Sequence, residues 1–251
     1  MGIIIFILGL MLGSFLNVVI YRLPKNESIV FPGSHCPLCG HPLRFYDNIP
    51  VLSYFFLRGQ CRDCQAKISL QYPMVELLTA VSLFILYLKF NLSVQFLAYS
   101  VLILFLIPIT VIDWKTYLIL NKLTLPGFIL GIVLILGFQI ETWKTVLLGG
   151  IGGGALAIFF VILGKFFFRK DSLGYGDVKL LVMIGIYVGF MGAALGLFLG
   201  SMAALIFILG RLVKRQLKLG DTIPFGPFIA IGTFVYLIFG KTIVNWYVGL
   251  F

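Results

Sequence analysis

The sequence predicts an all-α fold, a polytopic integral membrane bundle of about eight transmembrane helices with one large polar loop near its start. Three observations support this fold class. Of the 251 residues, 61% are hydrophobic and 11% are charged, a balance that a single soluble core does not bury. Apolar stretches close to the length of a bilayer span recur between short polar breaks. All four cysteines lie together in the one long polar segment.

The expected helices follow from those apolar stretches, since a span needs roughly 20 mainly apolar residues. They cover residues 2–20, 74–87, 94–112, 123–138, 145–163, 178–190, 192–212 and 225–246. The boundary between the sixth and seventh is soft. The first segment has no basic region before it and is followed by Tyr21-Arg22 rather than small residues, so we interpret it as a helix and not as a cleaved signal. The chain then divides into a first transmembrane helix (1–20), a loop (21–73) and a transmembrane core (74–251).

The net charge of +10 is explained by membrane topology and does not indicate a nucleic-acid partner. With the N-terminus outside the cell, every Lys and Arg lies on the cytoplasmic side except Lys89, Lys144 and Lys241. The long loop and the basic run Arg211-Lys214-Arg215-Lys218 then face the cytoplasm, where we expect contact with anionic lipid. The expected partner is therefore the lipid bilayer.

The four cysteines form two C-x-x-C pairs about 20 residues apart, Cys36/Cys39 and Cys61/Cys64. This spacing is typical of a Cys-four zinc site. The alternative is disulfides or inert thiols, and a reducing cytosolic location disfavours disulfides. Four thiolates leave no open coordination position, so the zinc is expected to be structural. His35 and His41 flank the first pair, and we interpret them as surface residues.

The sequence contains nine acidic residues, so each can be weighed. Glu27, Asp47, Asp63 and Glu141 lie in expected loops. Asp171 lies beside Arg169 and Lys170, where an ion pair is the simpler interpretation. The remaining four are Glu76, Asp113, Asp177 and Asp221.

Asp113 ends one apolar run and Asp177 begins another, at similar depth on the cytoplasmic ends of their helices. Two carboxylates that meet share a proton, which suits peptide hydrolysis by general acid and base catalysis. The structural alternative is that each caps a helix or pairs with a nearby Lys. Gly174 and Gly176 precede Asp177 and allow close approach of another chain segment.

The glycine cluster 149–154 lies in an apolar segment, and we interpret it as a helix-packing surface and not as a phosphate loop.

Several motifs in order resemble the type IV prepilin peptidases. They are the segment from Gly13-Ser14-Phe15-Leu16-Asn17 to Tyr21-Arg22-Leu23-Pro24, the two cysteine pairs, Tyr72-Pro73 with Glu76-Leu77-Leu78, Ile112-Asp113, Gly174-Tyr175-Gly176-Asp177-Val178-Lys179, and Pro224-Phe225-Gly226-Pro227. The resemblance covers nearly the whole chain. One departure is that Leu120 precedes Asn121 where the family usually has proline, which leaves the turn after Asp113 open.

The resemblance implies a membrane-embedded aspartic endopeptidase in the bacterial cytoplasmic membrane, with Asp113 and Asp177 as the catalytic pair. It implies prepilin or pseudopilin substrates of type IV pilus and type II secretion systems, cut after a glycine. Because the cysteine loop accompanies methylating members, it also implies N-methylation of the new terminus with S-adenosylmethionine. Glu76 is a candidate for that role or for holding the loop. Gly174, Gly176 and Lys179 are expected to support the site. Asp221 is a candidate contact for a basic leader.

Three alternatives remain open. The first is a peptidase of the same family without methyltransferase activity. The second is a related archaeal preflagellin peptidase, against which the cysteine loop and the segment from Gly13 to Pro24 argue. The third is a transporter or membrane scaffold with a zinc-ribbon loop. Transport acids are expected near mid-membrane, whereas Asp113 and Asp177 lie at helix ends.

Overall fold

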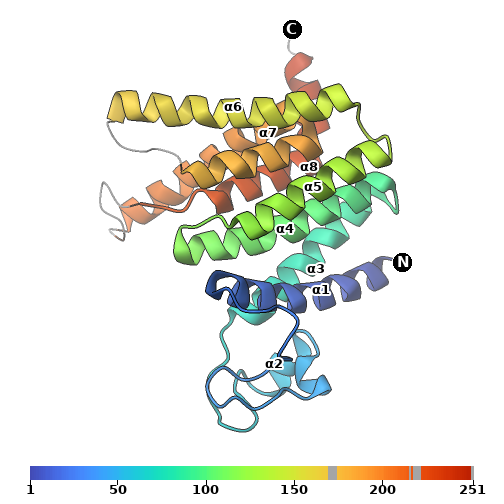
Figure 1. Ribbon diagram of the computed structural model, residues 1–251, viewed down its shortest axis with the longest axis vertical. Coiled ribbons are helices and arrows are strands. Elements are labelled where there is room, and N and C mark those ends of the chain that lie inside the picture. Colours follow the sequence, from blue (N-terminus) through green and yellow to red (C-terminus); the bar gives the residue numbers. More distant parts are fainter. Residues whose placement is uncertain (169–173, 215, 217–221, 250–251) are drawn as a thin grey trace. The chain divides into compact units, whose positions relative to one another are not determined.

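The computed structural model describes residues 1–168, 174–214, 216 and 222–249 (Figure 1). Within these ranges every regular element is a helix, apart from two isolated β-bridges. The α-helices are α1 (Gly2–Arg22), α2 (Leu52–Phe56), α3 (Gln71–Phe90), α4 (Val94–Thr116), α5 (Asn121–Gly137), α6 (Trp143–Phe168), α7 (Tyr175–Val213) and α8 (Gly226–Val248). Two short 3-10 helices, η1 (Leu23–Lys25) and η2 (Phe45–Asn48), lie in the first loop. The all-α prediction is confirmed.

Among the residues that the structure describes, six helices are long and apolar enough to cross a membrane, and α5 is apolar but shorter. Helix α7 has 39 residues, which as a straight rod would measure about 58 Å, twice the roughly 30 Å of hydrocarbon. It is broken at Gly189, where φ is 71° and ψ is 176°. Glycine adopts this conformation without a Cβ clash. The two halves of α7 correspond to the expected sixth and seventh helices, so the bundle has eight apolar helical segments in the described residues.

The chain divides into two compact units, Met1–Leu92 and Ser93–Phe251. The division falls after α3. The physical reason is that α1 and α3 pack directly on each other. A Cβ added at Gly9 would lie 2.5 Å from Ala80 Cα, so only glycine permits this approach. Asn17, 2% exposed, donates from Nδ2 to the Tyr72 carbonyl at 3.1 Å and joins the two helices.

The second unit contains α4 to α8, which lie side by side in Figure 1. The glycine cluster on α6 packs against α7, as predicted. A Cβ at Gly149 would collide with the carbonyl oxygen of Gly185, and one at Gly153 would lie 2.6 Å from the Leu181 carbonyl oxygen. Helix α7 in turn packs on α8, where a Cβ at Gly200 would lie 2.6 Å from the Phe228 carbonyl oxygen. Small residues thus bring three backbones together.

Candidate active site and metal centre

Asp113 lies in the last turn of α4, with its residue surface 5% exposed. Its Oδ2 accepts a hydrogen bond of 3.0 Å from the backbone N–H of Gly226. Gly226 is the first residue of α8, so its amide belongs to the helix end whose N–H groups have no partner within the helix. A Cβ at Gly226 would lie 2.7 Å from Asp113 Oδ2. Position 226 therefore supplies a donor and requires the absence of a side chain.

Asp177 lies in the first turn of α7 and is 7% exposed. Its Oδ2 accepts a hydrogen bond of 3.0 Å from the Gly174 N–H, while its own N–H donates to the Gly174 carbonyl at 3.0 Å. This local capping arrangement fixes the carboxylate at the amino end of the helix, where negative charge is favoured. Each aspartate thus has its Oδ2 bound to a backbone amide of a glycine.

The turn between α4 and α5 lies against the glycine neighbours of both aspartates. A Cβ at Gly176 would lie 2.9 Å from Ile119 Cβ, and one at Gly226 would lie 3.4 Å from Ile119 Cδ1. Gly176 precedes Asp177, and Gly226 binds Asp113. Asp113 and Asp177 therefore flank the same small region.

The turn itself begins at Tyr117, which has left-handed backbone angles of φ 57° and ψ 27° and donates its N–H to the Asp113 carbonyl. Asn121 begins α5, and its Oδ1 accepts a hydrogen bond of 2.8 Å from Lys179 Nζ. This contact places Lys179 beside the turn between α4 and α5, whose conformation the sequence did not predict, with Asn121 as its partner.

Glu76 on α3 is 7% exposed, and its Oε2 accepts a hydrogen bond of 2.7 Å from the Val51 N–H. Val51 has φ 64° and ψ −50°, and Leu52 donates to the Pro50 carbonyl at 2.6 Å. Together these describe a γ-turn that is rare and strained for a β-branched residue. Glu76 thus ties the loop to α3.

The four cysteine sulfurs lie within 4.8 Å of one another. Cys36 Sγ and Cys64 Sγ are 3.8 Å apart. Four sulfurs at about 2.3 Å from a tetrahedral zinc ion would be about 3.8 Å apart, so the donor set fits this metal. The cluster contains neither histidine, and His35 and His41 are exposed. The residues expected to hold zinc are therefore brought together.

The two C-x-x-C pairs have the same backbone arrangement. Gly40 donates to the Cys36 carbonyl at 2.9 Å, and Gln65 donates to the Cys61 carbonyl at 3.0 Å. Gly40 has φ 70° and Gln65 has φ 58°. The second pair therefore makes the same tight turn with a residue that carries a Cβ, which is less favourable than glycine.

The charges of the cysteine cluster also fit a cation. Backbone N–H groups of Cys39 and Leu38 lower the pKa of the Cys36 thiol to about 7. The Ala66 N–H acts to lower the pKa of Cys64, but burial and the three neighbouring cysteines outweigh it and raise that pKa to about 12. The Cys36 thiol therefore ionises readily, whereas its negative charge opposes the ionisation of the other thiols. A bound divalent cation would remove this repulsion.

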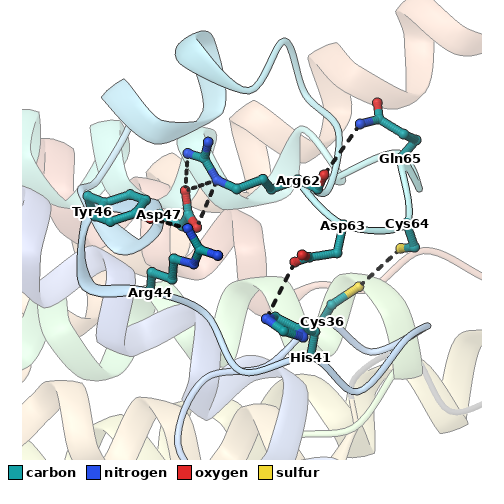
Figure 2. A network of polar contacts seen from close by, with 9 residues as sticks. All are labelled: Cys36, His41, Arg44, Tyr46, Asp47, Arg62, Asp63, Cys64 and Gln65. Carbon is teal, nitrogen blue, oxygen red and sulfur yellow. Dashed lines mark hydrogen bonds and ion pairs between the residues drawn. The ribbon is translucent and has the colours of Figure 1, made fainter.

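A network of polar contacts surrounds the cluster (Figure 2). Arg62, between the second pair of cysteines, donates from its guanidinium to both oxygens of Asp47, with the shortest distance 2.6 Å. The Tyr46 ring lies near the guanidinium groups of Arg62 and Arg44. His41 and Asp63 approach to 3.8 Å but are both well exposed, so their ion pair adds little. The Asp47 contact, with an almost fully buried carboxylate, holds η2 against the second pair.

The sequence did not single out Gly226 or Ile119 as parts of the site. Gly226 was noted only as part of the segment from Pro224 to Pro227. The feature that could have identified it as a site residue is a glycine at the start of a helix. Asp171, Arg215, Lys218 and Asp221 lie outside the described residues.

Two family models together match most of the chain. "Bacterial Peptidase A24 N-terminal domain" matches residues 7–90, and "Type IV leader peptidase family" matches residues 100–209. These matches agree with the two units of the structure. Comparison with solved structures gave no match.

Curated relatives are similar over nearly the full length. A protein of Aeromonas salmonicida is 34% identical, with 97% of this chain and 92% of the relative covered. One of Aeromonas hydrophila is 35% identical with the same coverage, and one of Pseudomonas aeruginosa is 34% identical, with 96% and 91% covered. Each is called prepilin leader peptidase/N-methyltransferase. With its membrane-spanning helices, this chain is a multi-pass enzyme of the bacterial inner membrane, and it belongs to the type IV leader peptidase family.

Proposed function

We propose that this protein cleaves the leader peptide of type IV prepilins or pseudoprepilins, using Asp113 and Asp177 as an aspartyl dyad. The observation that carries the proposal is that two buried carboxylates, each held by a glycine amide, flank the same region of the α4–α5 turn. The relatives named for prepilin cleavage support the substrate class.

The chemistry follows from the shared position of the two acids. One carboxylate is ionised and takes a proton from water as the water attacks the scissile carbonyl. The other carboxyl is protonated and donates a hydrogen bond to the carbonyl oxygen. When the C–N bond breaks, the aspartate pair then delivers a proton to the leaving amine. The Gly174 and Gly226 amides hold Oδ2 of the two aspartates in place, so little reorganisation is needed during the reaction.

The site is proposed to face the cytoplasm. Asp113 and Asp177 lie at helix ends next to the Lys179–Asn121 contact and share that side of the expected topology with the cysteine loop. The hydrophobic helix of the prepilin would pack in the bilayer and present its leader at the interface. A transporter with these acids is disfavoured by the family.

We further propose that the four cysteines hold a structural Zn²⁺ and that the enzyme methylates the new N-terminus with S-adenosylmethionine as donor. The sulfur spacing supports zinc, and the names of the relatives support methylation. Zinc would fix the loop, while S-adenosylmethionine would supply the methyl group. Glu76 binds the loop backbone, which supports a holding role for it.

The test is to incubate the intact protein in membranes with a prepilin and determine the mass and N-terminal sequence of the product. Removal of the leader at one bond, with a methyl group added only when S-adenosylmethionine is present, is the expected result. An uncut prepilin with correctly inserted, zinc-loaded protein would contradict the peptidase proposal. A cut but unmethylated product would contradict only the methylation.

A further inference from the structure

We propose that Ile119 is a specificity-determining residue, whose side chain forms the wall of the subsite between the two aspartates and limits the size of the substrate side chain beside the scissile bond. This inference rests on the proposed peptidase function.

The first support is the position of the Ile119 side chain. A Cβ added at Gly176 would lie between 2.9 and 3.4 Å from Ile119 Cβ, Cγ1 and Cδ1, and one added at Gly226 would lie 3.4 Å from Ile119 Cδ1, so Ile119 lies beside both glycines. Each glycine adjoins one aspartate, by sequence at Asp177 and by a hydrogen bond at Asp113. A peptide bond placed between the carboxylates would therefore lie beside Ile119. The side chain is only half-buried, so one side remains available to an incoming chain.

The second support is that the turn carrying Ile119 is held at both ends. On one side the Tyr117 hydroxyl donates to the Thr222 carbonyl at 3.4 Å, in the segment that leads into α8. On the other, Lys179 of α7 donates to Asn121 Oδ1 at 2.8 Å. The turn thus connects the two helix starts that carry the glycine contacts. A wall fixed in this way can exclude by size.

The energetic argument concerns added carbon atoms. One methylene too many in a close-fitting apolar pocket changes selectivity by roughly 10- to 200-fold. Ile119→Ala removes three carbon atoms and opens room beside the aspartates, while Ile119→Val removes one. Selectivity against a larger substrate side chain should therefore fall in that order.

The test measures kcat/KM for prepilin substrates that carry glycine, alanine or valine on either side of the scissile bond, one position at a time. The enzymes are the unchanged protein, Ile119→Val, Ile119→Ala and, as matched control, Leu118→Ala, a residue of the same turn that is 59% exposed. At one of the two positions we expect the glycine-to-valine ratio to fall about tenfold in Ile119→Ala. It should fall less in Ile119→Val and stay unchanged in Leu118→Ala.

Ratios that stay within twofold of the unchanged protein at both positions, with the glycine substrate still cut, would overturn this inference and leave the peptidase function intact. Loss of all cleavage in both Ile119 variants would also overturn it, because a pocket wall alters selectivity before it abolishes the reaction. Failure of the unchanged protein to cut any prepilin would instead count against the proposed function.

Discussion

The backbone N–H of Gly226 donates a 3.0 Å hydrogen bond to Asp113 Oδ2 across 113 positions of sequence. This contact attaches the start of α8 to the end of α4. It also explains why position 226 carries glycine, since a Cβ there would lie 2.7 Å from the same oxygen.

Gly226→Ala is expected to displace the Asp113 carboxylate and lower the cleavage rate about 100-fold, because displacements of about 1 Å at a catalytic group have effects of this size. The measurement is prepilin cleavage in membranes. Gly210→Ala is the control, since a Cβ at Gly210 meets nothing within 4 Å. Equal rates for the two variants would show that the Gly226 contact does not position Asp113.

The role of Glu76 in holding the cysteine loop can be tested by comparing Glu76→Gln with Glu76→Ala. Glu76→Gln keeps a carbonyl oxygen that accepts the Val51 N–H, so the cysteine loop should retain zinc as in the unchanged protein. Glu76→Ala leaves that N–H without its acceptor, at a cost of about 1–3 kcal/mol, and should lose zinc faster to a chelator. If methylation fails in Glu76→Gln while zinc is retained, Glu76 has a role in methyl transfer beyond holding the loop.

Removal of the metal should loosen the loop and leave the transmembrane helices folded. Chelation, or Cys39→Ser, is expected to expose the segment between α1 and α3 to protease, because the loop has few regular elements of its own. His41→Ala should retain zinc. The lowered pKa of Cys36 means that its thiolate is present above about pH 7 and is lost as pH falls, so zinc affinity should decrease on acidification from about pH 8 to about pH 6.

Gln65 adopts a left-handed backbone where the first cysteine pair has Gly40. Gln65→Gly should stabilise the loop by about 1 kcal/mol, since the Cβ penalty is removed, and zinc loss to a chelator should slow about fivefold. Gly40→Gln should act in the opposite direction. Faster zinc loss from Gln65→Gly would mean that the weak contact of its amide with the Arg62 carbonyl matters more than the backbone angles.

The sequence was sufficient for features that depend on composition and local spacing. Apolar length predicted the spans, the C-x-x-C spacing predicted the clustered sulfurs, and the glycine cluster on α6 predicted close packing. Tertiary contacts were not predictable in this way. The donation from Gly226 to Asp113 joins distant segments, and α3 packs with α1 through glycines whose partners only the fold reveals. Ile119 had no signal, because an isoleucine after an apolar helix is common.

The most direct test of the dyad is cleavage of a prepilin in membranes by Asp113→Asn, Asp177→Asn and the double variant, each checked for insertion and zinc content. Because the two acids act as a unit, each single change should lower the rate by about 10³-fold or more, and the double variant should be little worse. Near-normal cleavage by either single variant would contradict the dyad, since one remaining carboxylate cannot serve as both the base and the acid of the attacking step.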